Sequence, residues 1–171
     1  KIKYLSVALT EHNVKADIPA AKKLFAEWPT PVTMLTEDVG AALPFPGASI
    51  DKEFAAAVPD NPVADAYRAN RPMPYDAPST AMAAALYAGR PKEGYFKVSD
   101  PGTIAIHDDG RVSFATNPQG KHQQLMLDPA QKDTVLKAYV DLASAKPVIP
   151  QRFRPPVKAD ADKKDDISEK K

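Results

Sequence analysis

The sequence predicts an α/β fold, in which a partial parallel, Rossmann-like sheet with flanking helices is followed by an antiparallel β-hairpin region. Two observations carry this prediction. Residues 1–36 have the strand, helix, strand pattern of a βαβ unit, whose two strands are parallel. Residues 95–127 alternate in the manner of strands, and Asp109-Gly110 is a hairpin turn signal. A length of 171 residues suits one domain with its own core.

The βαβ unit begins with the apolar pattern of residues 1–9, which predicts the first strand. Asp17 stands at a helix N-cap position, two residues before Pro19, and apolar residues recur at helical spacing as far as Trp28. Prolines then end the helix, and the β-branched run over 32–36 predicts the second strand.

Prolines dominate the middle of the chain, where residues 51–58 and 61–70 predict two short helices. In the second helix we expect Val63, Ala66 and Tyr67 to share one face. Ser79 is expected to cap an alanine-rich helix over 80–88.

The predicted hairpin pairs residues 103–106 with 112–115, and 124–127 supplies a third strand before a last helix over 129–145. Residues 1–150 are expected to form one structured region. Residues 151–171 are expected to be a charged, disordered tail, because they hold almost nothing apolar to bury.

Composition excludes several classes of protein. Lys plus Arg total 23 against 22 Asp plus Glu, and the basic residues are scattered, so we expect no nucleic-acid partner. Without cysteine there is no disulfide and no thiolate metal site, and no apolar run is long enough to span a membrane. Nucleotide-phosphate loops and hydrolase elbow motifs are also absent.

The chain starts at Lys1 rather than Met, from which we expect that an upstream segment was removed or is missing.

Two clusters are candidates for a binding site. Glu11, His12 and Asn13 follow the first strand, and ligands bind at the carboxyl ends of strands in α/β sheets; the alternative is a polar loop. Asp76 precedes a helix, where it is either a capping carboxylate or one ligand of a hard cation such as Ca²⁺.

Of the remaining polar groups, some are expected to face solvent and others have two possible roles. We expect His107-Asp108-Asp109-Gly110 to be a solvated turn, and His122 to lie on the surface. Glu37 and Asp38 either extend the second strand into a ligand crevice or are solvated acids.

The order of these segments resembles the C-terminal part of the inosine/uridine-preferring nucleoside hydrolases. The resemblance rests on Glu11-His12-Asn13 with Asp17, on Trp28-Pro29-Thr30-Pro31-Val32, and on Pro74-Tyr75-Asp76 before the alanine-rich helix, and it extends to about residue 147. It implies a partial nucleoside-hydrolase sheet. It also implies that Glu11 and Asn13 contact the ribose of a nucleoside, and that Asp76 ligates a catalytic calcium ion and touches a ribose hydroxyl.

Two positions differ from the family pattern. Tyr75 replaces a histidine that assists the leaving base, and His12 stands at an often aromatic position where stacking on a base or sugar is expected. The family hydrolyses the N-glycosidic bond of ribonucleosides with a calcium-bound water, but its Asp-rich N-terminal motif has no counterpart here. The resemblance therefore implies an incomplete hydrolase, weakly active or inactive alone.

A second hypothesis treats the chain as a non-catalytic module that binds a ribosyl group or another sugar, or docks onto a partner. The resemblance leaves both a homo-oligomer and a partner that supplies the missing half open. Cytoplasmic and exported locations also stay open, and the proline content and charged tail favour an exported bacterial protein.

Overall fold

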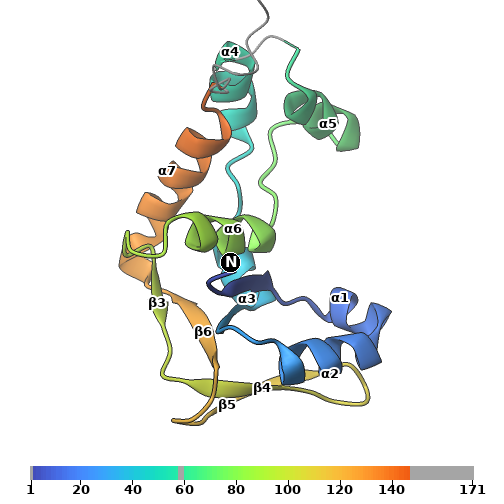
Figure 1. Cartoon of the computed structure of the whole chain (residues 1–171). Coiled ribbons are helices and arrows are strands. Elements are labelled where there is room, and N and C mark those ends of the chain that lie inside the picture. The colour runs from blue at the N-terminus through green and yellow to red at the C-terminus, as the bar shows by residue number, and fades with distance from the viewer. Residues whose placement is uncertain (1, 58–59, 147–171) are drawn as a thin grey trace, which may run out of the picture.

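A computed structural model describes residues 2–57 and 60–146 of the chain, and the predicted charged tail lies outside these residues. It confirms an α/β fold with an open mixed sheet (Figure 1). The strand order is β1-β2-β6-β4-β5, and β3 pairs with a second part of β6. The strands are β1 (Leu5–Ala8), β2 (Val32–Leu35), β3 (Phe96–Val98), β4 (Gly102–Ile106), β5 (Val112–Thr116) and β6 (His122–Leu127).

The predicted βαβ unit is present. β1 and β2 pair in parallel with Leu5 opposite Val32, and two helices connect them, α1 (Glu11–Ala16) and α2 (Ile18–Glu27). Asp17 caps α2 as predicted, because its Oδ1 accepts the N–H of Ala20 at 2.9 Å. The first strand is shorter than expected.

Glu11, His12 and Asn13, for which a polar loop was the alternative, form the first turn of α1. The hydroxyl of Thr10 accepts the N–H of Asn13 at 3.3 Å and so caps this helix. The cap, and the burial of Val14 against the sheet, stabilise a helix only six residues long.

Strand β6 has two sets of neighbours. Its first half pairs in parallel with β2, with Val32 opposite His122, and its second half pairs antiparallel with β3, with Leu125 opposite Val98. The predicted hairpin is β4–β5, and its turn ends in Gly110, whose φ of 83° favours glycine. The sheet curls so that this hairpin lies beneath α2 (Figure 1).

Two apolar cores lie on either side of β2. Val32 and Met34 pack with α1, α2 and β4, in a core that includes Val14, Phe25, Ile104 and Ile106. Leu35 packs into the second core, which brings together α3 (Glu37–Ala42), α5 (Pro62–Asn70), α6 (Thr80–Gly89) and α7 (Lys132–Ala143). The other short elements are a π-helix at Ile50–Phe54, α4 (Ala55–Ala57) and a 3₁₀ turn at Pro129–Gln131.

Several local predictions need correction. Ser79 does not cap α6 through its side chain; its hydroxyl instead donates to the carbonyl of Leu43. On α5 the buried residue is Ala64, whereas Val63 is exposed. The helix α3 was not predicted, and it places Glu37 and Asp38 in its first turn, where acids favour the helix dipole.

Candidate functional site

The first part of the candidate site is the start of α1, directly after the carboxyl end of β1. Glu11 lies on the surface, where its Oε2 accepts from Nζ of Lys15 at 2.6 Å, and the carboxylate raises the pKa of that amino group. Asn13 borders an apolar cavity of about 250 Å³ between β1 and α2, whose lining includes Val7 and Leu24. His12 is exposed beside them.

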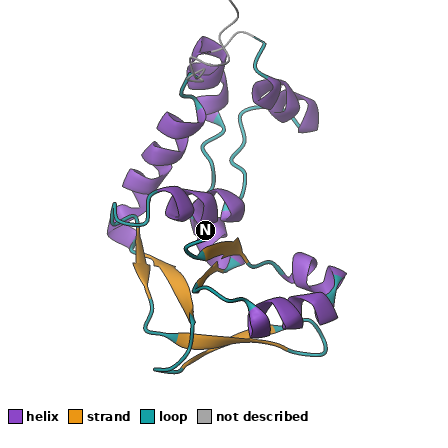
Figure 2. Cartoon of the chain, in the orientation of Figure 1, coloured by secondary structure: helices purple, strands orange, loops and turns teal. Residues whose placement is uncertain are grey.

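The second part is Asp76, which lies in the loop before α6, and this loop runs beside the loop that follows α3 (Figure 2). Phe45 and Ala77 exchange backbone hydrogen bonds of 2.7 and 3.2 Å, and Oδ1 of Asp76 accepts the N–H of Gly47 at 2.9 Å. One carboxylate oxygen therefore fixes the loop. The residue itself is exposed, so its other oxygen can accept from a ligand.

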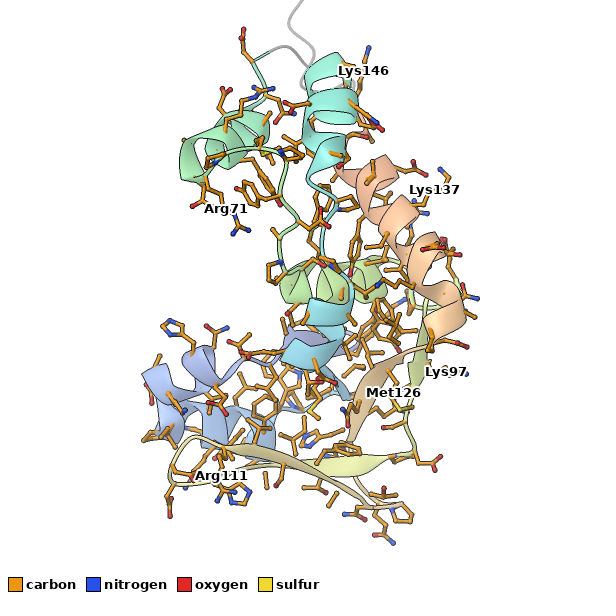
Figure 3. All side chains as sticks on the ribbon, turned by 180° about the vertical axis from the view of Figure 1, so that it is seen from behind. Arg71, Lys97, Arg111, Met126, Lys137 and Lys146 are labelled. Atoms are coloured by element: carbon orange, nitrogen blue, oxygen red, sulfur yellow. The ribbon has the colours of Figure 1, made fainter. Side chains whose placement is uncertain are left out.

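Tyr75 turns toward α5 rather than toward α6. Its ring stacks on Tyr67 at 5.2 Å, and the guanidinium of Arg71 lies 4.0 Å above it. The Tyr75 hydroxyl donates to the carbonyl of Tyr67 and accepts from the side-chain amide of Asn70, both at 3.1 Å. Figure 3 shows the side chain of Arg71 beside α5. Because the phenol hydroxyl already donates one hydrogen bond and accepts another, it is not available to protonate a leaving group.

Both parts of the candidate site lie toward one edge of the sheet. Helix α6 runs antiparallel beside β1, because the Tyr4 hydroxyl donates to Ala88 O at 2.7 Å and the Ser6 hydroxyl to Ala84 O at 2.8 Å. The N-terminal end of α6 therefore lies at the carboxyl end of β1, where α1 also begins. Thr80 packs there against Gly40 of α3, the helix that follows β2.

The two parts do not touch. Among the described residues, no hydrogen bond or ion pair joins Glu11, His12 or Asn13 to Tyr75 or Asp76. The shared sheet edge thus brings them to the same side of the fold without a direct contact.

A calcium site does not form from the described residues alone. Residues 2–57 and 60–146 contain no group of three or more histidine or acidic side chains close enough to hold a metal ion. Calcium takes six to eight oxygen ligands, and Asp76 supplies one carboxylate, half of which is bonded to Gly47. The donors present therefore do not fit the ion.

His122 is the group that the sequence misplaced most clearly. It is 7% exposed, its Nδ1 accepts the N–H of Ile104 at 2.8 Å, and its ring meets Phe25 edge-to-face at 6.1 Å. The prediction of a surface histidine is wrong because β6 pairs with β2 inside the sheet. Thr36 was also missed: its hydroxyl is buried at the end of β2 and has no partner among the described residues.

The buried histidine predicts a specific pH dependence. Burial lowers the pKa of His122 below its ordinary 6.5, and Lys121 adds to this effect. The unfolded chain therefore binds more protons than the folded one, so the free energy of unfolding falls as pH drops below 6.5. We expect urea denaturation between pH 7.5 and 5 to give a slope of up to about 1.4 kcal/mol per pH unit in this window.

The variant His122→Gln isolates this effect, because glutamine accepts the Ile104 N–H without taking up a proton. We expect its pH slope between 7.5 and 5 to be smaller than that of the wild type. His12→Gln, at an exposed position on α1, is the control and keeps the slope. An unchanged slope in His122→Gln would show that another group is responsible.

Comparison with known proteins adds no assignment. No protein-family model and no curated protein matches the chain. Within the described part of the chain, no helix combines the length and apolar character needed to cross a bilayer.

Proposed function

We propose that the chain is a nucleoside-hydrolase-like protein that binds the ribosyl group of a nucleoside at the carboxyl edge of β1 and β2. The observation that carries the proposal is the shared edge: α1 begins there with Glu11 and Asn13, and α6 begins there after Asp76. Sequence order alone left these groups far apart, and an α/β sheet binds ligands at this edge.

The chemistry of the three side chains suits a polyhydroxylated ligand. Ribose hydroxyls both donate and accept, carboxylates of Glu11 and Asp76 accept, and the Asn13 amide does both. Each carboxylate keeps one oxygen free of the bonds to Lys15 and Gly47. His12 offers a ring on which a base or sugar can stack.

Binding, rather than turnover, is the proposed activity of this chain by itself. The intact family cleaves the N-glycosidic bond with a calcium-bound water, and the donors described above do not fit calcium. The Tyr75 hydroxyl is bonded to Tyr67 and Asn70, so we propose no acid role for it. Nucleoside hydrolysis is thus proposed for the fold together with a further acidic segment.

A docking role is the second candidate, and it is favoured by the position of β1 at the end of the described strand order. Leu5 and Leu9 donate their N–H groups to Pro31 and Leu35 of the β2 side. In a parallel ladder the alternate residues, Ser6 and Ala8, then direct their backbone groups away from β2. β1 is the first strand in the sheet order, so a strand from a partner can pair with these groups.

The ribosyl proposal is tested by NMR titration of the full chain with inosine, with 2′-deoxyinosine as the matched ligand. We expect amide shifts at Thr10–Asn13 and at Asp76–Thr80 together, with weaker binding of the deoxynucleoside. Asp76→Asn and Glu11→Gln should each weaken inosine binding roughly three- to tenfold, since a hydrogen bond to a charged group is worth about 1 kcal/mol or more. Glu93→Gln, far along the chain after α6, is the control.

Two results would contradict the proposal. One is a shift at only one of the two segments, which would separate Asp76 from the α1 site. The other is a binding curve that neither variant changes. Release of free base from inosine at about 1 s⁻¹ or faster, with or without added Ca²⁺, would overturn the expectation that the chain alone is inactive.

A further inference from the structure

We infer that the cleft between α2 and β4 binds a small organic anion with a flat aromatic body. This cleft has a volume of about 460 Å³, within the range of small-molecule sites. It lies between the C-terminal half of α2 and residues 103–106, and the turn at 117–121 borders it. Its lining shares Phe25, Ile104 and Ile106 with the core between α2 and β4, and does not include Asp76. The inference does not depend on the ribosyl site.

The floor of the cleft is rigid. His122 lines it in a fixed orientation, because its Nδ1 accepts the N–H of Ile104 and its ring meets Phe25 edge-to-face. Asn117 at the border is held in the same way, with its amide donating to the Thr103 hydroxyl at 3.2 Å. A preorganised surface of this kind loses little freedom when a ligand binds.

The charge of the cleft favours an anion. Lys22 and Lys121 both line it, and its lining contains no aspartate or glutamate. Lys22 pairs with Asp108 at the hairpin tip. The side chain of Asp108 is 99% exposed, so this pair contributes little and a ligand anion can compete for Lys22.

The aromatic preference comes from Trp28 and Phe25, which form the α2 side of the cleft. Trp28 is half-buried, and its indole N–H donates to the hydroxyl of Thr30 at 2.9 Å, which fixes the ring. A fixed indole offers a flat apolar surface to a planar ligand, and stacking or edge contacts between rings add to the burial of apolar area.

The experiment is an NMR titration of the full chain with naphthalene-2-sulfonate, and 2-naphthalenemethanol is the neutral match. The chain has one tryptophan, so the indole N–H of Trp28 gives a single resonance that reports on this cleft. We expect this resonance and the amides of residues 103–106 to shift with the sulfonate, and the alcohol to bind more weakly. The segments at Thr10–Asn13 and Asp76–Thr80 should not move, which separates this site from the ribosyl site.

Charge variants decide the role of the lysines. Lys22→Gln and Lys121→Gln should each weaken sulfonate binding roughly two- to fivefold, as expected for exposed charge pairs. Asp108→Asn should strengthen it by a similar factor, because it removes the competing carboxylate from Lys22. Lys92→Gln, at an exposed lysine outside the cleft, is the control. Equal affinity for the alcohol, an unmoved Trp28 resonance, or a loss of affinity in Asp108→Asn would overturn the inference.

Discussion

Replacing Gly47 with alanine is expected to lower the free energy of unfolding by about 3 kcal/mol or more. A methyl group at this position would lie 1.9 Å from the carbonyl oxygen of Tyr75 and 2.7 Å from its nitrogen. These are backbone atoms, so they cannot move aside as a side chain would. The two loop segments would have to separate, which breaks the Phe45–Ala77 bonds and the contact between Gly47 and Asp76.

The matched control is Gly89→Ala at the end of α6, where a methyl group would meet nothing within 4 Å. There we expect no loss, or a gain of up to about 1 kcal/mol, because alanine favours a helix over glycine. Urea denaturation of both variants at pH 7.5 measures the difference. If Gly47→Ala were as stable as the wild type, the close approach of the two segments, and with it the support of Asp76, would be wrong.

Replacing Leu125 with alanine is expected to cost about 2–5 kcal/mol. Leu125 is fully buried on β6 and packs in the core formed by α3, α6 and α7. It also stands in the half of β6 that pairs with β3, so its cavity cannot be filled without disturbing that pairing. Since domains are stable by only about 5–15 kcal/mol, such a loss is a large part of the total.

Met126→Ala provides the comparison, because its side chain follows in the same strand and is 41% exposed. We expect it to change the free energy of unfolding by about 0.5 kcal/mol or less. The test is a pair of urea denaturation curves with equal slopes and different midpoints. Similar losses in the two variants would mean that β6 does not present alternate faces to core and solvent.

The sequence predicted the βαβ unit and the hairpin because their signals are local. Asp17 capping α2 and the glycine at the hairpin turn act over a few residues, and the structure contains both. The short α1 was missed, since six residues with one buried side chain carry little helical periodicity. Its stability comes from the Thr10 cap and from Val14 packing on the sheet, and a linear pattern does not show the second of these.

Positions that depend on distant pairing were not predictable. His122 was expected on the surface because no acidic or hydroxyl neighbour suggested a catalytic role, but β6 is inserted beside β2 and buries it. The cleft between α2 and β4 could not be predicted either, because its sides come from separate parts of the chain. For the proposed ribosyl site, the sequence supplied the residue types, and the antiparallel course of α6 beside β1 supplied their common edge.

The position of β6 has a consequence for how the chain acquires its structure. Val32 pairs with His122, so the central strand of the sheet joins β2 only after most of the described chain is available. Pairings between residues so distant in sequence form slowly, because the intervening loop must close first. During synthesis β2 can therefore pair only with β1 until β6 is available, whereas β4 and β5 can form their hairpin without β6. The complete sheet can therefore form only after β6 has been synthesised, later than the first strands.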